Sequence, residues 1–144
     1  MSSGEYAGKK ILVVATFGAN NPERCPAPFM FAGEAIKAGG EAGICFVLQA
    51  PQILKQGVAE DLRAKEGGRT IREFIDEALA LGVKFYVCDA ALQLCSMKPE
   101  DLIDEIDDLV GPSFLIKQGF APETIEVDEK SAIRPPRTGG GGRR

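Results

Sequence analysis

Continuous apolar runs constrain the fold of this chain most. Residues 11–15, 43–48 and 83–87 are rich in Val, Ile, Leu and Phe, and turn-forming or charged residues bound each run. Runs without polar alternation are typical of strands buried on both faces of a parallel sheet. Helical patterns separate these runs, which favours βαβ units. The sequence therefore predicts a three-layer α/β/α sandwich around a mostly parallel sheet of four to five strands.

The remaining elements are predicted from caps and periodicity. Thr70 and Glu73 form a capping-box pattern before an apolar stripe, and Gly82 follows it, so a helix is expected over residues 70–81. Other helices are expected over residues 29–38, 89–94 and about 99–109. A fourth strand is expected over residues 113–117 and a short fifth strand over 124–127.

The chain has 144 residues, which suits one domain with a single core. We assign residues 1–9 to an N-terminal extension, 10–130 to the domain and 131–144 to a flexible tail, because IRPPRTGGGGRR cannot build a core. No apolar run approaches the roughly 20 residues of a membrane helix. The first residues also lack the apolar stretch of a secretory signal. We therefore expect a cytoplasmic protein that binds no membrane.

Composition excludes several kinds of chemistry. The chain carries 17 basic and 21 acidic residues, a formal charge of −4, so it offers no basic face for nucleic acid. It has no histidine, which excludes Ser-His and Cys-His catalysis within the chain. Its four cysteines form no C-x-x-C pair. We expect neither a metal site nor a cofactor.

The predicted strand ends give the candidate pocket. In open α/β sheets, ligands bind beyond the carboxyl ends of the strands. The residues that follow the first three strands are therefore expected to line a site: Thr16, Phe17, Gly18, Asn20, Gln49, Cys88 and Asp89.

Cys88 is the candidate for chemistry. It stands where a strand ends and a short helix begins, and the helix dipole there favours a thiolate. The neighbouring carboxylate of Asp89 opposes a second negative charge, so the direction of the net pKa shift stays open. The alternative is a small buried hydrophobe. Cys45 lies in mid-strand and is expected in the core, whereas Cys25, in a proline-rich loop, and Cys95 are possible accessory thiols. We expect Cys25 to be exposed.

The stretch VKFYVCDAALQLCSMKPEDL resembles the strand-Cys-helix segment of DsrE/DsrF-like proteins, which include TusD-type sulfur-relay subunits. ILVVATFG and the GICFVL strand, which leads into a Q-x-P-x-x-L-K-Q-G-V loop, resemble the first half of that family. The resemblance covers residues 10–118. It implies a flavodoxin-like sandwich that assembles into homotrimers or hexamers. It also implies that Cys88 accepts a persulfide from a donor protein and passes it to an acceptor.

Three functions follow as hypotheses. The leading one is a cytoplasmic sulfur carrier of the sulfurtransferase type that uses Cys88. The second is a non-catalytic oligomeric module that binds a small ligand or a protein. The third is a thiol redox sensor that pairs Cys88 with Cys25 or Cys95. Apolar side chains near the strand ends, among them Phe17, Phe29 and Phe31, are expected to pack partly between subunits.

Overall fold

The structure, a computed structural model, describes residues 7–120 and 124–128. Five strands form one sheet in the order β4-β3-β2-β1-β5, and each neighbouring pair is parallel. The strands are β1 (Lys10–Ala15), β2 (Glu41–Phe46), β3 (Lys84–Cys88), β4 (Asp108–Val110) and β5 (Thr124–Asp128). The three apolar runs thus form the middle of the sheet, and the predicted fifth strand lies at its edge beside β1.

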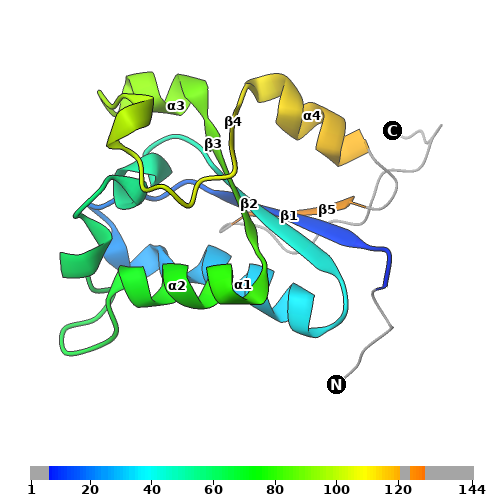
Figure 1. The fold of residues 1–144 in the computed structure, drawn as a ribbon, viewed down its shortest axis with the longest axis horizontal. Coiled ribbons are helices and arrows are strands. Elements are labelled where there is room, and N and C mark those ends of the chain that lie inside the picture. Colours follow the sequence, from blue (N-terminus) through cyan, green and yellow to red (C-terminus); the bar gives the residue numbers. More distant parts are fainter. Residues whose placement is uncertain (1–6, 121–123, 129–144) are drawn as a thin grey trace.

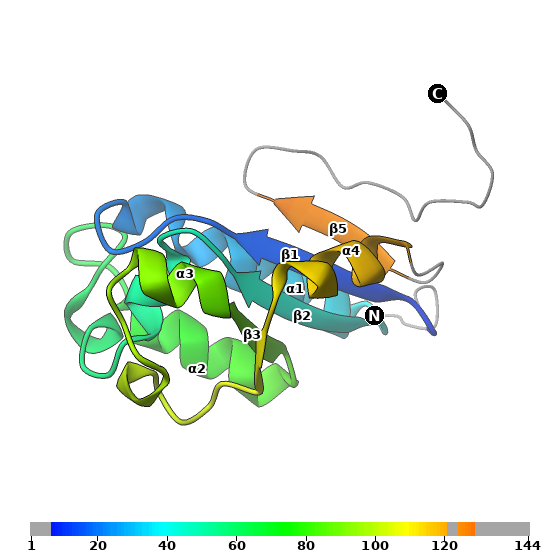
Figure 2. The ribbon, with the colours of Figure 1, turned by 90° about the horizontal axis from the view of Figure 1, so that it is seen from above.

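Two pairs of helices cover the sheet. Helices α1 (Pro26–Lys37) and α2 (Ile71–Leu81) lie on one face, and α3 (Asp89–Leu94) and α4 (Pro112–Phe120) lie on the other (Figures 1 and 2). This arrangement confirms the predicted three-layer sandwich. Short 3-10 helices complete the connections: η1 (Pro22–Arg24), η2 (Ala50–Leu54), η3 (Ala59–Asp61) and η4 (Pro99–Asp101).

The main core lies between the sheet and the α1/α2 layer. Phe29 of α1, Phe46 of β2 and Phe85 of β3 form a triangle with ring centroids 5.4 to 5.9 Å apart. Phe46 and Phe85 have no exposed surface, and Phe29 is 3% exposed. Successive strand residues point to opposite faces, so Phe85 belongs to this core and Tyr86 does not.

A smaller cluster lies under α4. Leu12, Cys45 and Val110 are buried there, and Tyr86 and Phe114 pack against them while remaining half-buried. The Tyr86 and Phe114 ring centroids are 4.8 Å apart. This second face of the sheet therefore carries a thinner core.

The caps of α2 confirm the predicted helix. The Thr70 hydroxyl accepts a hydrogen bond from the Glu73 backbone N–H at 3.2 Å, which satisfies one of the free donors of the first turn. Gly82 ends the helix at φ 97°, a left-handed conformation that costs glycine little.

The helix predicted over residues 99–109 is wrong. Only η4 is helical, and an irregular segment leads from it into β4. A helix here would place acidic residues four apart on one face, as with Glu100 and Asp104, where like charges repel. The segment instead bonds to its neighbours: Ile103 N–H donates to Leu54 C=O at 2.9 Å, and Phe85 N–H donates to the Asp107 carboxylate at 2.8 Å.

The strand predicted over residues 113–117 is also wrong, because this segment belongs to α4. A short apolar run does not distinguish a strand from a helix by periodicity. Pro112 begins the helix, where its fixed φ is favourable and no N–H is needed. The fourth strand of the sheet is β4, which lies just before this run and has only three residues.

Parts of the predicted organisation lie outside the described residues. These are residues 1–6 of the expected extension and residues 129–144, which include the expected tail. Within the described part of the chain, no helix combines the length and apolar character needed to cross a membrane.

Candidate functional site

Cys88 is the last residue of β3 and the N-cap of α3, as the sequence predicts. Its thiol makes no capping hydrogen bond to that helix. Strand alternation places its side chain on the same face as Tyr86, beneath the α3/α4 layer, and its register partner is Val110. Cys88 is buried, with 8% of the whole residue exposed.

Cys45 lies on the same face of the neighbouring strand. It is 1% exposed, which confirms the prediction of a core residue. Burial, with a smaller contribution from Cys88, raises the pKa of the Cys45 thiol to about 12. Cys45 therefore stays protonated at neutral pH and does not compete with Cys88 as a nucleophile.

Cys95 caps the far end of α3 and is only half-buried. Its thiol donates a hydrogen bond to the Leu48 carbonyl oxygen at 3.3 Å. Burial raises the pKa of this thiol, and a hydrogen bond at the Gln52 backbone opposes that rise. Leu48 has φ 53°, an unusual conformation for a bulky residue, and its side chain is 51% exposed. Cys95 therefore lies beside an exposed apolar residue after β2.

Cys25 is not an exposed thiol, contrary to the prediction. It is the N-cap of α1 and 3% exposed. Its Sγ lies 3.5 Å from the carbonyl oxygens of Gly18 and Asn21. The proline-rich loop turns this side chain inward, toward the loop that follows β1. Cys25 also packs into the α1/α2 core, whereas Cys88 lies on the other face of the sheet.

The loops after β1 and β2 pack closely on each other. A Cβ atom at Gly18 would overlap the Gln49 carbonyl oxygen and the Gln52 side-chain oxygen. The Ala19 backbone N–H donates to that Gln52 oxygen at 2.9 Å. Only glycine permits this approach, which joins two of the segments predicted to form the site.

The other predicted lining residues lie at this same edge of the sheet, but they differ in how far they are exposed. Thr16 and Phe17 are half-buried, whereas Asn20, Gln49 and Asp89 are exposed. Strand β2 lies between the end of β1, which leads to Thr16, and the end of β3 at Cys88. The structure thus brings Gly18 and Gln49 together and sets Cys88 one strand away from the loop after β1.

The aromatic residues near this edge differ in exposure. Phe29 is buried in the core, so it is not available to pack between subunits as expected. Phe31 is 50% exposed on α1. The Arg24 guanidinium lies over the Phe17 ring, and the distance from Cζ of Arg24 to the ring centroid is 4.9 Å.

Sequence reasoning missed a cavity at the opposite, amino edge of the sheet. It measures about 360 Å³ and is lined by residues of β1, β2, β3 and α4, Lys84 and Tyr86 among them, and by Ile36 and Leu81 at the ends of α1 and α2. Gly43, the first residue of the apolar run 43–48, was the available signal, since a glycine within a strand often marks a close approach. In the described residues, no group of three His, Cys, Asp or Glu side chains is placed to hold a metal ion.

The fold and the strand-end thiol define a class: a flavodoxin-like α/β sandwich with a cysteine between a central strand and a helix. The sequence model of the DsrE/DsrF-like family matches residues 9–120, so the chain belongs to this family. A comparison with curated proteins gives no match.

Two solved structures share the fold. The YchN protein of E. coli is 13% identical, with a TM-score of 0.63, over 83% of this chain and 98% of that one. MTH1491 of Methanobacterium thermoautotrophicum, described as a protein of unknown function, is also 13% identical, with a TM-score of 0.55, over 82% of this chain and 97% of that one. At this identity the likeness establishes the fold alone.

Proposed function

We propose that the protein is a sulfur carrier in which Cys88 accepts a sulfane sulfur as a persulfide. The position of Cys88 carries the proposal, because this residue ends a central strand at its carboxyl edge and 8% of its surface is exposed. This is the edge where α/β sheets bind their ligands. Membership of the DsrE/DsrF-like family, some of whose members relay sulfur, supports it.

The transfer needs only thiol chemistry. The Cys88 thiolate attacks the outer sulfur of a donor persulfide, R–S–SH. The new S–S bond forms at Cys88, the donor S–S bond breaks, and the donor leaves as a thiolate. A partner thiolate then attacks the outer sulfur of Cys88–S–SH and leaves the Cys88 thiolate behind. Each step exchanges one S–S bond for another, so no external oxidant or reductant is consumed.

The partial burial of Cys88 is compatible with this role. Loading requires the donor to reach Sγ of Cys88, but in the second transfer the partner attacks the outer sulfur, which lies about 2 Å beyond Sγ. A buried thiol is also shielded from bulk oxidants, whereas the half-buried Cys95 is more open to them.

The test compares three proteins by intact mass after incubation with glutathione persulfide: the wild type, Cys88→Ser and Cys95→Ser. Cys95 is the matched control, because it caps the other end of α3 and is the more exposed thiol. We expect the wild type and Cys95→Ser to gain one sulfur atom and Cys88→Ser to gain none. The proposal fails if the wild type gains no sulfur, or if Cys88→Ser gains it as the wild type does.

We also propose that the protein works in the cytoplasm as a homo-oligomer with protein donors and acceptors. Adjacent residues on α1 support self-assembly, since Met30 is 57% and Phe31 50% exposed. Apolar side chains of this kind are favourable in a subunit interface. A monomeric mass by light scattering would contradict self-assembly.

A further inference from the structure

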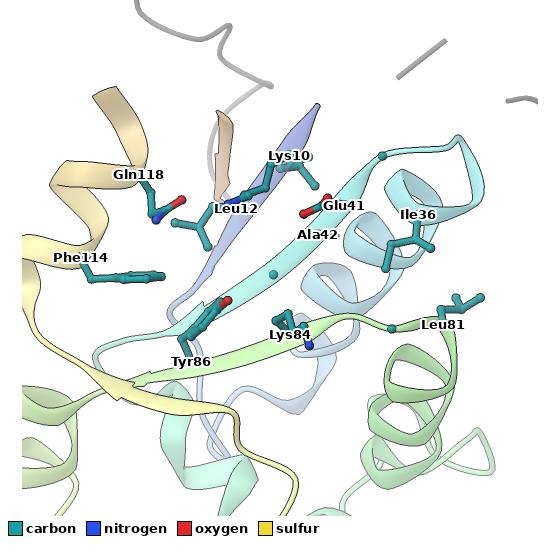
Figure 3. Close-up of a pocket in the computed structure, with 14 residues that line it drawn as sticks. Lys10, Leu12, Ile36, Glu41, Ala42, Leu81, Lys84, Tyr86, Phe114 and Gln118 are labelled. Atoms are coloured by element: carbon teal, nitrogen blue, oxygen red, sulfur yellow. The ribbon is translucent and has the colours of Figure 1, made fainter. Parts of the chain in front are cut away.

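The amino edge of the sheet carries a groove at the opposite end of the strands from Cys88. Its volume is about 360 Å³, within the range of cavities that hold small organic molecules. Figure 3 shows side chains from three strands and from α4 around it, together with Ile36 of α1 and Leu81 of α2. The side chains that would contact a ligand are Lys10, Glu41, Lys84, Tyr86 and Phe114.

A glycine creates the hollow. Leu12, Gly43 and Lys84 are register partners on β1, β2 and β3, so they form one row across the sheet. The middle position has no side chain, and a Cβ there would lie 2.9 Å from Cε2 of Tyr86. The Tyr86 ring therefore leans over the bare backbone of β2, and the space beside the ring stays open.

One wall of the groove is apolar. Leu12 is 2% exposed, and the Tyr86 and Phe114 rings pack together at an interplanar angle of 46°. Figure 3 shows the Phe114 ring extending from α4 toward the hollow, with the side chain of Leu12 beside it. A ring-sized apolar body can pack against the two half-buried rings, which themselves cover Leu12.

The rim of the groove is charged. Lys10, Glu41 and Lys84 come from three adjacent strands, and within the described residues no ion pair involves any of them. The rim thus carries two ammonium groups and one carboxylate, a net positive charge among these three. Burial, with the charges of Asp107, Asp108 and Glu41, raises the pKa of Tyr86, so its hydroxyl keeps the proton that it can donate. The Tyr86 hydroxyl points toward the hollow and adds a hydrogen-bond donor (Figure 3).

We propose that this groove binds a small monocarboxylate with an apolar, ring-sized body. The ligand carboxylate pairs with Lys10 and Lys84 and accepts from the Tyr86 hydroxyl. Its apolar body packs against the half-buried Tyr86 and Phe114 rings. The Glu41 carboxylate repels a second negative charge, which disfavours dicarboxylates. The site does not involve Cys88 and goes beyond the sulfur-carrier proposal.

The protein contains a built-in reporter. It has no tryptophan and only two tyrosines, Tyr6 and Tyr86, so Tyr6→Phe leaves Tyr86 as the single source of tyrosine fluorescence. Cyclohexanecarboxylate is the probe, because it does not absorb where tyrosine does. We expect a saturable change in Tyr86 emission with cyclohexanecarboxylate. We expect no saturable change with cyclohexylamine, which has the same body and the opposite charge.

Variants locate the site. In the Tyr6→Phe background, Lys10→Met and Lys84→Met should each weaken binding by about three- to fivefold, the usual effect of an exposed charge. Lys55→Met is the matched control, since Lys55 is an exposed lysine outside the groove, and it should bind as the parent does. Gly43→Ala should move the Tyr86 ring into the hollow and weaken binding about tenfold or more. Thermal melting of each variant checks that it is folded.

Three results would overturn the proposal: no saturable change with cyclohexanecarboxylate, equal binding of cyclohexylamine, or equal affinities of Lys84→Met and Lys55→Met. Cys88→Ser should bind the probe normally. The proposal of binding in the groove can therefore be wrong while the sulfur-carrier proposal is right, and the reverse is also possible.

Discussion

The two faces of the sheet are built differently from the same strands. Strand β3 alternates between them, with Phe85 and Val87 on the α1/α2 face and Tyr86 and Cys88 on the α3/α4 face. The first face is closed by large apolar side chains with no exposed surface. The second holds a small cluster, a half-buried tyrosine, two thiols and the Tyr86 and Phe114 wall of the groove. We infer that one face stabilises the fold and that the other is left free for chemistry and binding.

Adjacent residues on β3 test this division with the largest expected effect. Phe85→Ala removes a fully buried ring from the aromatic triangle and should lower the free energy of unfolding by about 3–5 kcal/mol. Tyr86→Ala removes a half-buried ring from the thinner face and should cost about 1–2 kcal/mol. Urea denaturation of the two variants measures both values.

The pair is matched, because both changes remove an aromatic ring from the same strand. Similar losses of stability would mean that the α4 face contributes as much as the α1/α2 face. A larger loss for Tyr86→Ala would reverse the comparison.

The sequence predicts the better-packed face more accurately than the other. The apolar runs, the Thr70 cap and Gly82 predict strands β1 to β3 and helix α2, because each of these elements satisfies local rules of pattern and capping. The errors concern residues 99–117, whose structure depends on tertiary contacts. The carbonyl of Leu54 and the backbone of Phe85 hold this segment, and no local pattern shows that these partners lie nearby.

The same limit applies to the site. The order of strands and helices was sufficient to place Cys88 at the carboxyl end of a strand. The burial of Cys25 was not predictable, because it depends on how the loop after β1 folds back onto α1. The groove was missed because its lining joins three strands with a helix that was expected to be a strand.

Cys45 gives an intermediate effect that depends on pH. Burial raises its pKa from 9.0 to about 12, so folding favours the protonated thiol. The resulting stabilisation is fully present below pH 9 and is lost as the pH rises toward 12, since the unfolded chain deprotonates first. Between pH 8 and pH 10, the deprotonation of this thiol in the unfolded chain should lower the free energy of unfolding of the wild type by about 1 kcal/mol.

Cys45→Ala isolates that contribution. The variant is destabilised at every pH by its small cavity, but its stability should fall less steeply than that of the wild type above pH 9. Urea denaturation at pH 8 and pH 10 gives the two differences. Parallel losses in wild type and variant would show that Cys45 is not buried as deeply as its 1% exposure indicates.

The smallest effect is expected from charge on the outer surface of the α1/α2 layer. Arg72 of α2 pairs with Asp76 at 2.9 Å and with Glu105 at 2.7 Å, and the second pair joins the helix to the segment before β4. The hydrogen bond from Arg72 lowers the pKa of Glu105 below its ordinary value of 4.5. This stabilisation is therefore present above about pH 4.5 and is lost as the pH falls through the lowered pKa.

Because both side chains are partly solvated, a double-mutant cycle with Arg72→Met and Glu105→Gln at pH 7 should give a coupling of about 0.2–1 kcal/mol. A coupling as large as the cost of Phe85→Ala would show that surface charge, and not the aromatic core, accounts for the stability of this face.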